Sequence, residues 1–294
     1  MDPIKEPEVK ALISLLDDSD KEVYSHIEEK LVSMGQYVIP FLEDAWSHAF
    51  DPVMQQRIAL IVHKIQFDSL MEELRLWIHT GDDDLLRGVL LVARYQYPEL
   101  DEEKVRQFID QIKKEIWIEM NESLTALEQV NIMNHIFFSK YGFAGNTTNY
   151  HAPQNSYINC VIESRKGNPL ALSVLYLLVA KSLGLPVYGV NLPEHFILTY
   201  LEVIENQEGN TGRVLFYINP FSKGSVFGKG DIDQFVKKLN LDPQNSYYQP
   251  CSNKDMVLRM LRNLAFSYQK LGDTEKVDEL SRMIRLFGDM AAAD

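Results

Sequence analysis

The fold of this 294-residue chain is decided by residues 168–196, NPLALSVLYLLVAKSLGLPVYGVNLPEHF. Asn168 is a typical helix N-cap, and Pro169 suits the first helical position because a backbone N–H there would have no partner within the helix. Residues 170–180 are apolar nearly all round, which predicts a helix buried in the core. The Gly-Leu-Pro stretch at 184–186 would end it. We therefore expect one central, buried helix.

Three strand-like runs follow this helix, at residues 187–192, 195–204 and 213–221. The last two flank a polar loop at 205–212, which predicts an antiparallel hairpin. Folding about that loop would bring His195, at the start of one strand, close to Asn219, at the end of the next. Polar residues should therefore gather at one end of the hairpin.

The regions on either side of this core are predicted to be helical. Asp20, Asp51 and Asp82 recur every 31 residues, each placed to cap a helix, and apolar positions four apart follow each of them. We interpret residues 1–120 as a HEAT-like region of stacked helix pairs, 121–250 as an α+β core, and 251–294 as a helical hairpin similar to one tetratricopeptide unit. The predicted fold class is α+β, predominantly helical.

The composition excludes several classes of protein. Hydrophobic residues make up 46% and charged residues 24%, typical of a globular protein, and two cysteines are too few for a disulfide framework or a zinc site. Residues 1–120 hold 25 acidic and 13 basic side chains, so this region should repel the phosphate backbone of nucleic acid. The most apolar stretch is too short to span a membrane, and no secretory signal is recognised. We expect a cytoplasmic protein with no metal or other cofactor.

Several motifs occur in an order that resembles a known family. They are Gly142–Asn146 (GFAGN), Asn155–Asn159 (NSYIN), Arg165–Pro169 (RKGNP), Leu183–Pro186 (LGLP), Gly189–Phe196 (GVNLPEHF) and Ile218–Phe221 (INPF). Together they resemble the SirB-type bacterial family of the transglutaminase-like superfamily. The resemblance implies a papain-like α+β core at 121–250.

The resemblance also implies which positions would carry catalysis. Transglutaminase-like enzymes use a Cys–His–Asp triad in which the Cys opens the core helix. The histidine matches His195, but the nucleophile position holds Pro169 and the acid position holds Asn219. Proline has no reactive group, and an amide cannot stabilise an imidazolium by charge. The resemblance therefore implies this fold without its usual catalysis.

Three hypotheses for function remain open from the sequence. The first is a non-catalytic regulatory or interaction module that binds an unknown protein or peptide partner. The second is an amide or isopeptide hydrolase, or acyl transferase, with a displaced nucleophile, Cys160 or less favourably Ser173, acting with His195. The third is an adaptor that uses the acidic N-terminal region. For the first two, the candidate cleft residues that would bind the ligand are Asn155, Asn168, Asn191 and Glu194.

Overall fold

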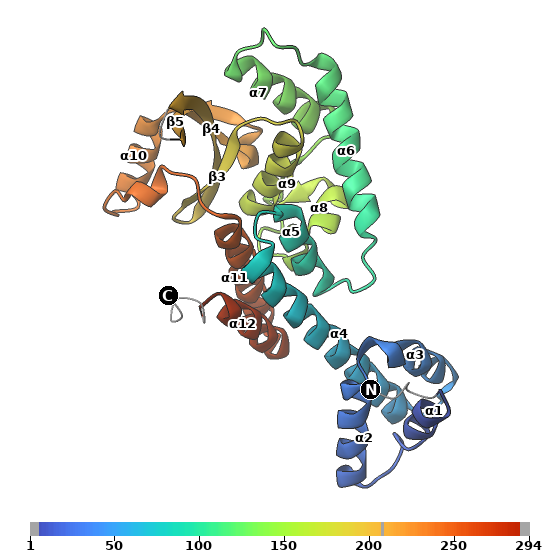
Figure 1. The fold of residues 1–294 in the computed structure, drawn as a ribbon. Helices are drawn as coiled ribbons and strands as arrows, with labels where there is room; N and C mark the ends of the chain where they lie inside the picture. The colour runs from blue at the N-terminus through green and yellow to red at the C-terminus, as the bar shows by residue number, and fades with distance from the viewer. Residues whose placement is uncertain (1–5, 207–208, 289–294) are drawn as a thin grey trace. The chain divides into compact units, whose positions relative to one another are not determined.

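A computed structural model describes residues 6–206 and 209–288 of the chain (Figure 1). The chain forms two compact units, residues 1–76 and 77–294, and the division falls within the long helix α4 (Pro52–Thr80). The three regions expected from the sequence, 1–120, 121–250 and 251–294, divide the chain differently and stay a prediction.

The first unit is helical. It contains α1 (Glu6–Ser14), α2 (Lys21–Ser33), the short 3-10 helix η1 (Gly35–Val38), α3 (Ile39–His48) and most of α4. Asp20 caps α2 as predicted, since its side chain accepts a hydrogen bond from the Glu22 N–H at 2.8 Å. The helices bury one apolar face each in a common core. Its buried members are Val9, Ile13, Leu16, Ile27, Leu31, Val38, Leu42, Ile58, Ile61 and Ile65.

The 31-residue spacing does not produce equal helix pairs. Residues 52–80 form one continuous helix rather than the predicted pair, because no Gly or Pro between residues 53 and 80 breaks the helical hydrogen bonding. The cap of the next helix, α5 (Leu85–Arg94), is Asp84, which accepts from the Arg87 N–H at 3.0 Å. The predicted cap, Asp82, precedes it by two residues. The HEAT-like assignment stays a prediction.

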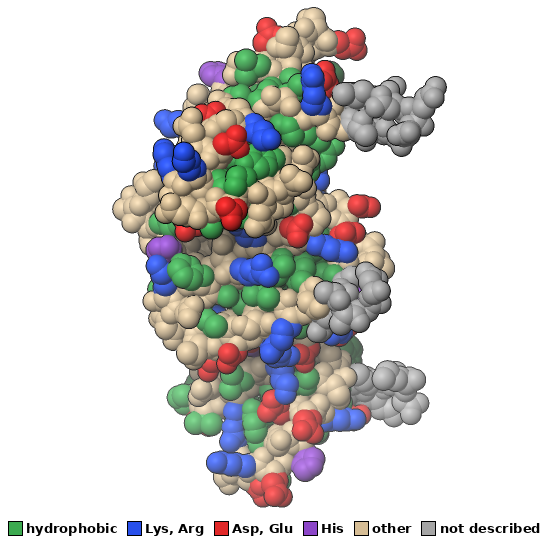
Figure 2. Space-filling view, turned by 90° about the vertical axis from the view of Figure 1, so that its left-hand side faces the viewer, with side chains coloured by type: hydrophobic (Ala, Val, Ile, Leu, Met, Phe, Trp, Pro, Cys, Tyr) green, Lys and Arg blue, Asp and Glu red, His purple; other side chains and the backbone are tan. Residues whose placement is uncertain are grey.

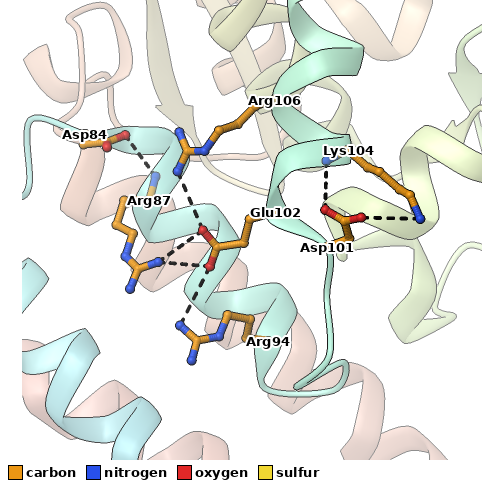
Figure 3. A network of polar contacts seen from close by, with 7 residues as sticks. All are labelled: Asp84, Arg87, Arg94, Asp101, Glu102, Lys104 and Arg106. Atoms are coloured by element: carbon orange, nitrogen blue, oxygen red, sulfur yellow. Dashed lines mark hydrogen bonds and ion pairs between the residues drawn. The ribbon is translucent and has the colours of Figure 1, made fainter.

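A polar network joins α5 to α6 (Glu102–Glu119) in the second unit (Figure 3). The Glu102 carboxylate lies 3.0 Å from Arg87, 3.7 Å from Arg106 and 3.8 Å from Arg94. Asp101 caps α6 by accepting from a backbone N–H. Because Glu102 also lies in the first turn of α6, its negative charge is favoured by the helix dipole as well as by the arginines.

The centre of the second unit is the predicted buried helix, α9 (Pro169–Ser182). The Asn168 side chain caps it by accepting from the Ala171 N–H at 2.8 Å, and every residue from Pro169 to Ala180 is buried. In Figure 1, α9 lies between the strands and α6, and it also contacts α8 (Ile158–Ser164). The remaining helices of this unit are α7 (Ala126–Asn134), the π-helix η2 (His135–Lys140), α10 (Lys229–Lys238), α11 (Asn253–Leu271), α12 (Thr274–Gly288) and three short 3-10 helices.

A four-stranded antiparallel sheet covers one side of α9. Its order is β3 (Val187–Leu192), β4 (His195–Asn206), β5 (Gly209–Asn219) and β6 (Ser225–Phe227). A two-residue turn joins β3 to β4, and within it Glu194 has a φ of +55°, in the left-handed region that non-glycine residues seldom adopt. The predicted hairpin is present, although β4 and β5 extend further into the predicted loop. A separate parallel pair has two residues in each strand, β1 (Ala144–Gly145) and β2 (Lys166–Gly167).

The two C-terminal helices form a hairpin that packs against this core. The predicted turn is present, with Gly272 at a φ of +75° ending α11. Helix α11 contacts α5, α9 and β3. The predicted α+β, predominantly helical fold is thus confirmed. No helix in the described residues combines the length and apolar character needed to cross a membrane. Acidic and basic side chains are interspersed on the face drawn in Figure 2.

Candidate functional site

His195 and Asn219 meet at one end of the β4–β5 hairpin. His195 is the first residue of β4 and Asn219 the last of β5, and these two strands pair in antiparallel register. Asn219 Nδ2 lies 3.1 Å from His195 Nε2. The predicted proximity of the two side chains is confirmed, while a catalytic role for either stays a prediction.

The orientation of the Asn219 amide is set by the chain that follows it. Its Oδ1 accepts hydrogen bonds from the backbone N–H groups of Phe221, at 3.1 Å, and Ser222, at 3.3 Å. Two donors require an oxygen, so the amide nitrogen must face the imidazole. A donating Nδ2 needs an unprotonated Nε2 as acceptor. The proton of the neutral His195 ring therefore lies on Nδ1.

The surroundings of His195 also disfavour its charged form. Burial lowers the pKa of the imidazole, and the positive charge of Arg259 lowers it further. The rings of Phe235 and Phe221 lie with their centroids 6.2 and 6.5 Å from that of the imidazole. The site therefore holds His195 as a neutral ring with a defined tautomer.

His195 lines a cleft of about 150 Å³ formed by four parts of the second unit, one of which is the loop that carries Tyr150 and His151. Asn168 and Pro169 come from the start of α9, Glu194 and His195 from the β3–β4 turn, and Arg259 from α11. The position at which the resemblance implies a nucleophile therefore lines the same cleft as the histidine. That position is occupied by a proline, Pro169. Of the residues that line the cleft, none carries a thiol.

Arg259 is a site residue that the sequence reasoning missed. Its Nη1 donates hydrogen bonds to the Asn191 side chain and, at 2.7 Å, to the Leu192 carbonyl. The guanidinium also lies 5.7 Å from the centroid of the Phe196 ring. A signal was present in the sequence: Arg259, Asn263 and Ser267 are spaced four apart, which places three polar side chains on one helical face. All three line the cleft.

The four predicted binding residues have different surroundings. Asn155 is buried; its side chain accepts from Asn146 and donates to the backbone carbonyls of Asn149 and Tyr150, so it holds the loop that precedes it in place. Asn168 lines the cleft while capping α9 and donating to Ser156 at 2.8 Å. Asn191 reaches the cleft only through its bond to Arg259. Glu194 is exposed and lines the cleft directly.

The two candidate displaced nucleophiles are not hydrogen-bonded to His195. Cys160, on α8, donates to the Tyr97 hydroxyl at 3.1 Å and does not line the cleft. Burial raises the pKa of its thiol, which disfavours the reactive thiolate. Ser173 is fully buried in α9, and its hydroxyl has no hydrogen-bond partner among the described residues.

Comparison with known proteins identifies the family. The transglutaminase-like superfamily matches residues 103–262, more than half of the chain. The chain belongs to the transglutaminase-like superfamily. A UPF0162 protein of Xylella fastidiosa (strain 9a5c) is 30% identical over 224 residues, which are 71% of this chain and 74% of that protein. F-box only protein 21 of Homo sapiens is 28% identical over 158 residues, which are 53% of this chain and 24% of that protein.

This transglutaminase-like chain has no significant match among solved structures. The superfamily match, residues 103–262, includes His195, Asn219, Pro169 and Arg259, whereas Asn263, Phe266 and Ser267, which also line the cleft, follow its last residue. The finer resemblance to SirB-type proteins stays a prediction. Within residues 6–206 and 209–288, no group of three or more His, Cys, Asp or Glu side chains is arranged to hold a metal ion.

Proposed function

We propose that this transglutaminase-like protein is a non-catalytic interaction or regulatory module whose His195 cleft binds a peptide-like ligand. The observation that carries the proposal is Pro169. It lines the cleft beside His195 at the first position of α9, where transglutaminase-like enzymes have their nucleophile. A covalent acyl intermediate cannot form on a proline side chain.

The histidine is also unsuited to act as a general base. A base must accept a proton through a free ring nitrogen. Here Nε2 already accepts a hydrogen bond from Asn219, and Nδ1 carries the ring proton. If the ring became charged, Asn219 would offer no negative charge to stabilise it, unlike the acid of a triad. The His195–Asn219 pair is therefore better suited to presenting fixed hydrogen-bonding groups to a ligand than to transferring a proton.

The alternative with Cys160 as nucleophile gains no support from the geometry. Its thiol is bonded to Tyr97, and burial raises its pKa. Catalysis by this route would require the thiol to leave that partner and move to the histidine. The adaptor hypothesis stays a prediction.

Binding is favoured because the cleft combines features common in ligand sites. Polar groups from α9, the β3–β4 turn and α11 converge on one small concave space beside aromatic rings. These elements come from segments far apart in the sequence and are held together by the buried helix α9. A rigid site of this kind lowers the entropy cost of binding.

The test is a turnover assay on the full chain. Purified protein is incubated with peptide amides, peptide esters and a primary amine acceptor, and products are identified by mass spectrometry, with an authentic transglutaminase as positive control. We expect the wild type to form no more product than the His195→Ala variant. Product formation by the wild type that is lost in His195→Ala would refute the proposal.

A further inference from the structure

Arg259 is a cation placed in the cleft, and no residue that the structure describes gives it a negatively charged partner. Its two Nη1 hydrogens are used by the Asn191 side chain and the Leu192 carbonyl, which are both neutral groups. A guanidinium has five N–H donors, so three remain, on Nε and Nη2. None of these three has a hydrogen-bond acceptor among the described residues, and no ion pair is formed there.

The free donors are the ones best suited to a carboxylate. The Nε–H and one Nη2–H lie side by side on one edge of the guanidinium and point in the same direction. That edge matches the two oxygens of a carboxylate, which it can bind through two parallel hydrogen bonds. The bonds made by Nη1 fix the plane of the group, so the free edge is already oriented.

Arg259 is also partly withdrawn from water. Burial lowers the pKa of its guanidinium, which means that its charge is less well solvated than on an open surface. A cation in such a place gains stability when an anion arrives. Among the described residues, Glu194 is the one carboxylate that lines the cleft, but it is exposed and forms no ion pair with Arg259.

The neighbouring His195 favours the same kind of ligand. Its Nε2 accepts from Asn219, so the nitrogen left for a ligand is Nδ1, which carries a proton and can only donate. An ionised carboxylate only accepts hydrogen bonds. The imidazole ring and the guanidinium therefore both donate hydrogen bonds, and both require a hydrogen-bond acceptor from the ligand.

From these observations we propose that the cleft binds the carboxylate group of a peptide, with Arg259 as the anchor. This inference rests on the proposed binding function of the cleft and adds the chemical class of its ligand. A carboxylate fits better than a phosphate, because a single guanidinium beside a neutral imidazole cannot balance two negative charges. The cleft volume of about 150 Å³ suits one such group with a small side chain.

The test compares matched peptides on the full-length protein by calorimetric titration. The probes are N-acetyl-Gly-Ala-Ala with a free C-terminal carboxylate, the same peptide as its C-terminal amide, and N-acetyl-Ala-Glu-Ala-amide, which carries its carboxylate on a side chain. Inorganic phosphate is the fourth probe. We expect at least one carboxylate peptide to bind about tenfold or more tightly than the uncharged amide. Comparison of the two carboxylate peptides then shows whether the bound carboxylate is that of a chain terminus or that of an acidic side chain.

Variants on α11 assign the effect to Arg259. Arg259→Gln should remove the preference for the carboxylate, and Arg259→Lys should reduce it, because lysine keeps the charge but not the paired donors. Arg262 is an exposed arginine on the same helix, so Arg262→Gln is the control and should leave the preference for the carboxylate unchanged. Thermal unfolding of each variant confirms that it is folded. The comparison of acid and amide on the wild type stands even if an Arg259 variant fails to fold.

The outcomes separate this inference from the proposed function. Four results would overturn the carboxylate inference alone. The first two are equal binding of the acid and the amide, and no binding of either carboxylate peptide. The others are tighter binding of phosphate, and a preference for the carboxylate that survives Arg259→Gln in a folded protein. Mass spectrometry of the same samples shows whether any peptide was cleaved. Cleavage that depends on His195 would instead refute the non-catalytic function.

Discussion

Replacing Asn219 by aspartate should convert the neutral histidine into one that is charged near neutral pH. The aspartate can keep the helix-capping bonds, because one carboxylate oxygen can accept from the Phe221 and Ser222 N–H groups as Oδ1 does now. The other oxygen then takes the place of Nδ2, 3.1 Å from Nε2. An acceptor there requires a proton on Nε2. The substitution therefore reverses the direction of the hydrogen bond to His195.

The size of the effect follows from the geometry. Two opposite charges about 4 Å apart attract by about 4 kcal/mol at the effective dielectric constant near a protein surface. Since about 1.4 kcal/mol corresponds to a change of one in pKa, the upper limit is a rise of about 3. Partial desolvation of the new carboxylate reduces this gain. We expect Asn219→Asp to raise the pKa of His195 by about 2 from the lowered value of the wild type.

The assay is an NMR titration of the imidazole ring, using the nitrogen and proton chemical shifts of His195. Asn245→Asp is the matched control, because it adds the same charge at an exposed position in the 3-10 helix η5 (Asn245–Tyr247). It should leave the His195 titration unchanged. A His195 pKa that does not rise in Asn219→Asp, or wild-type nitrogen shifts that place the neutral-ring proton on Nε2, would refute the assigned amide orientation.

Two further predictions concern the same ionisable groups. Because the folded protein keeps the pKa of His195 below the value of 6.5 expected for the unfolded chain, unfolding takes up a proton at low pH, so stability should decrease as the pH falls below 6.5. His195→Gln should flatten this part of the profile in urea unfolding. Alkylation of Cys160, measured with Cys251→Ser throughout, should be slow at neutral pH and unaffected by His195→Ala, because burial raises the thiol pKa. Fast labelling that requires His195 would contradict the non-catalytic function.

The parts of the fold that could be predicted are those with strong local signals. The buried helix α9 follows from its Asn168 cap, the proline after it and a continuous apolar run. The hairpin follows from two strand-like runs around a polar loop, and it brought His195 and Asn219 together because antiparallel pairing relates the start of one strand to the end of the next. These signals depend on residues that are close in sequence.

Local patterns were less informative about the N-terminal helices. The recurrence at 31 residues is a property of the sequence, but it does not state where a helix ends. No Gly or Pro lies between residues 53 and 80, and residues 52–80 form one helix where a pair was expected. Apolar periodicity describes which face of a helix is buried, and the same pattern is compatible with one long helix or two short ones.

Local residue patterns were enough to establish the superfamily resemblance, the central helix, the histidine and the absence of a nucleophile at Pro169, because each is a matter of residue type at a position in such a pattern. The three-dimensional fold was needed to establish which nitrogen of His195 carries the proton, that Cys160 bonds Tyr97, and that Arg259 of α11 enters the cleft. Each of these depends on atoms brought together from distant segments by packing around α9. Contacts of that kind are fixed by the whole fold, and no local pattern encodes them.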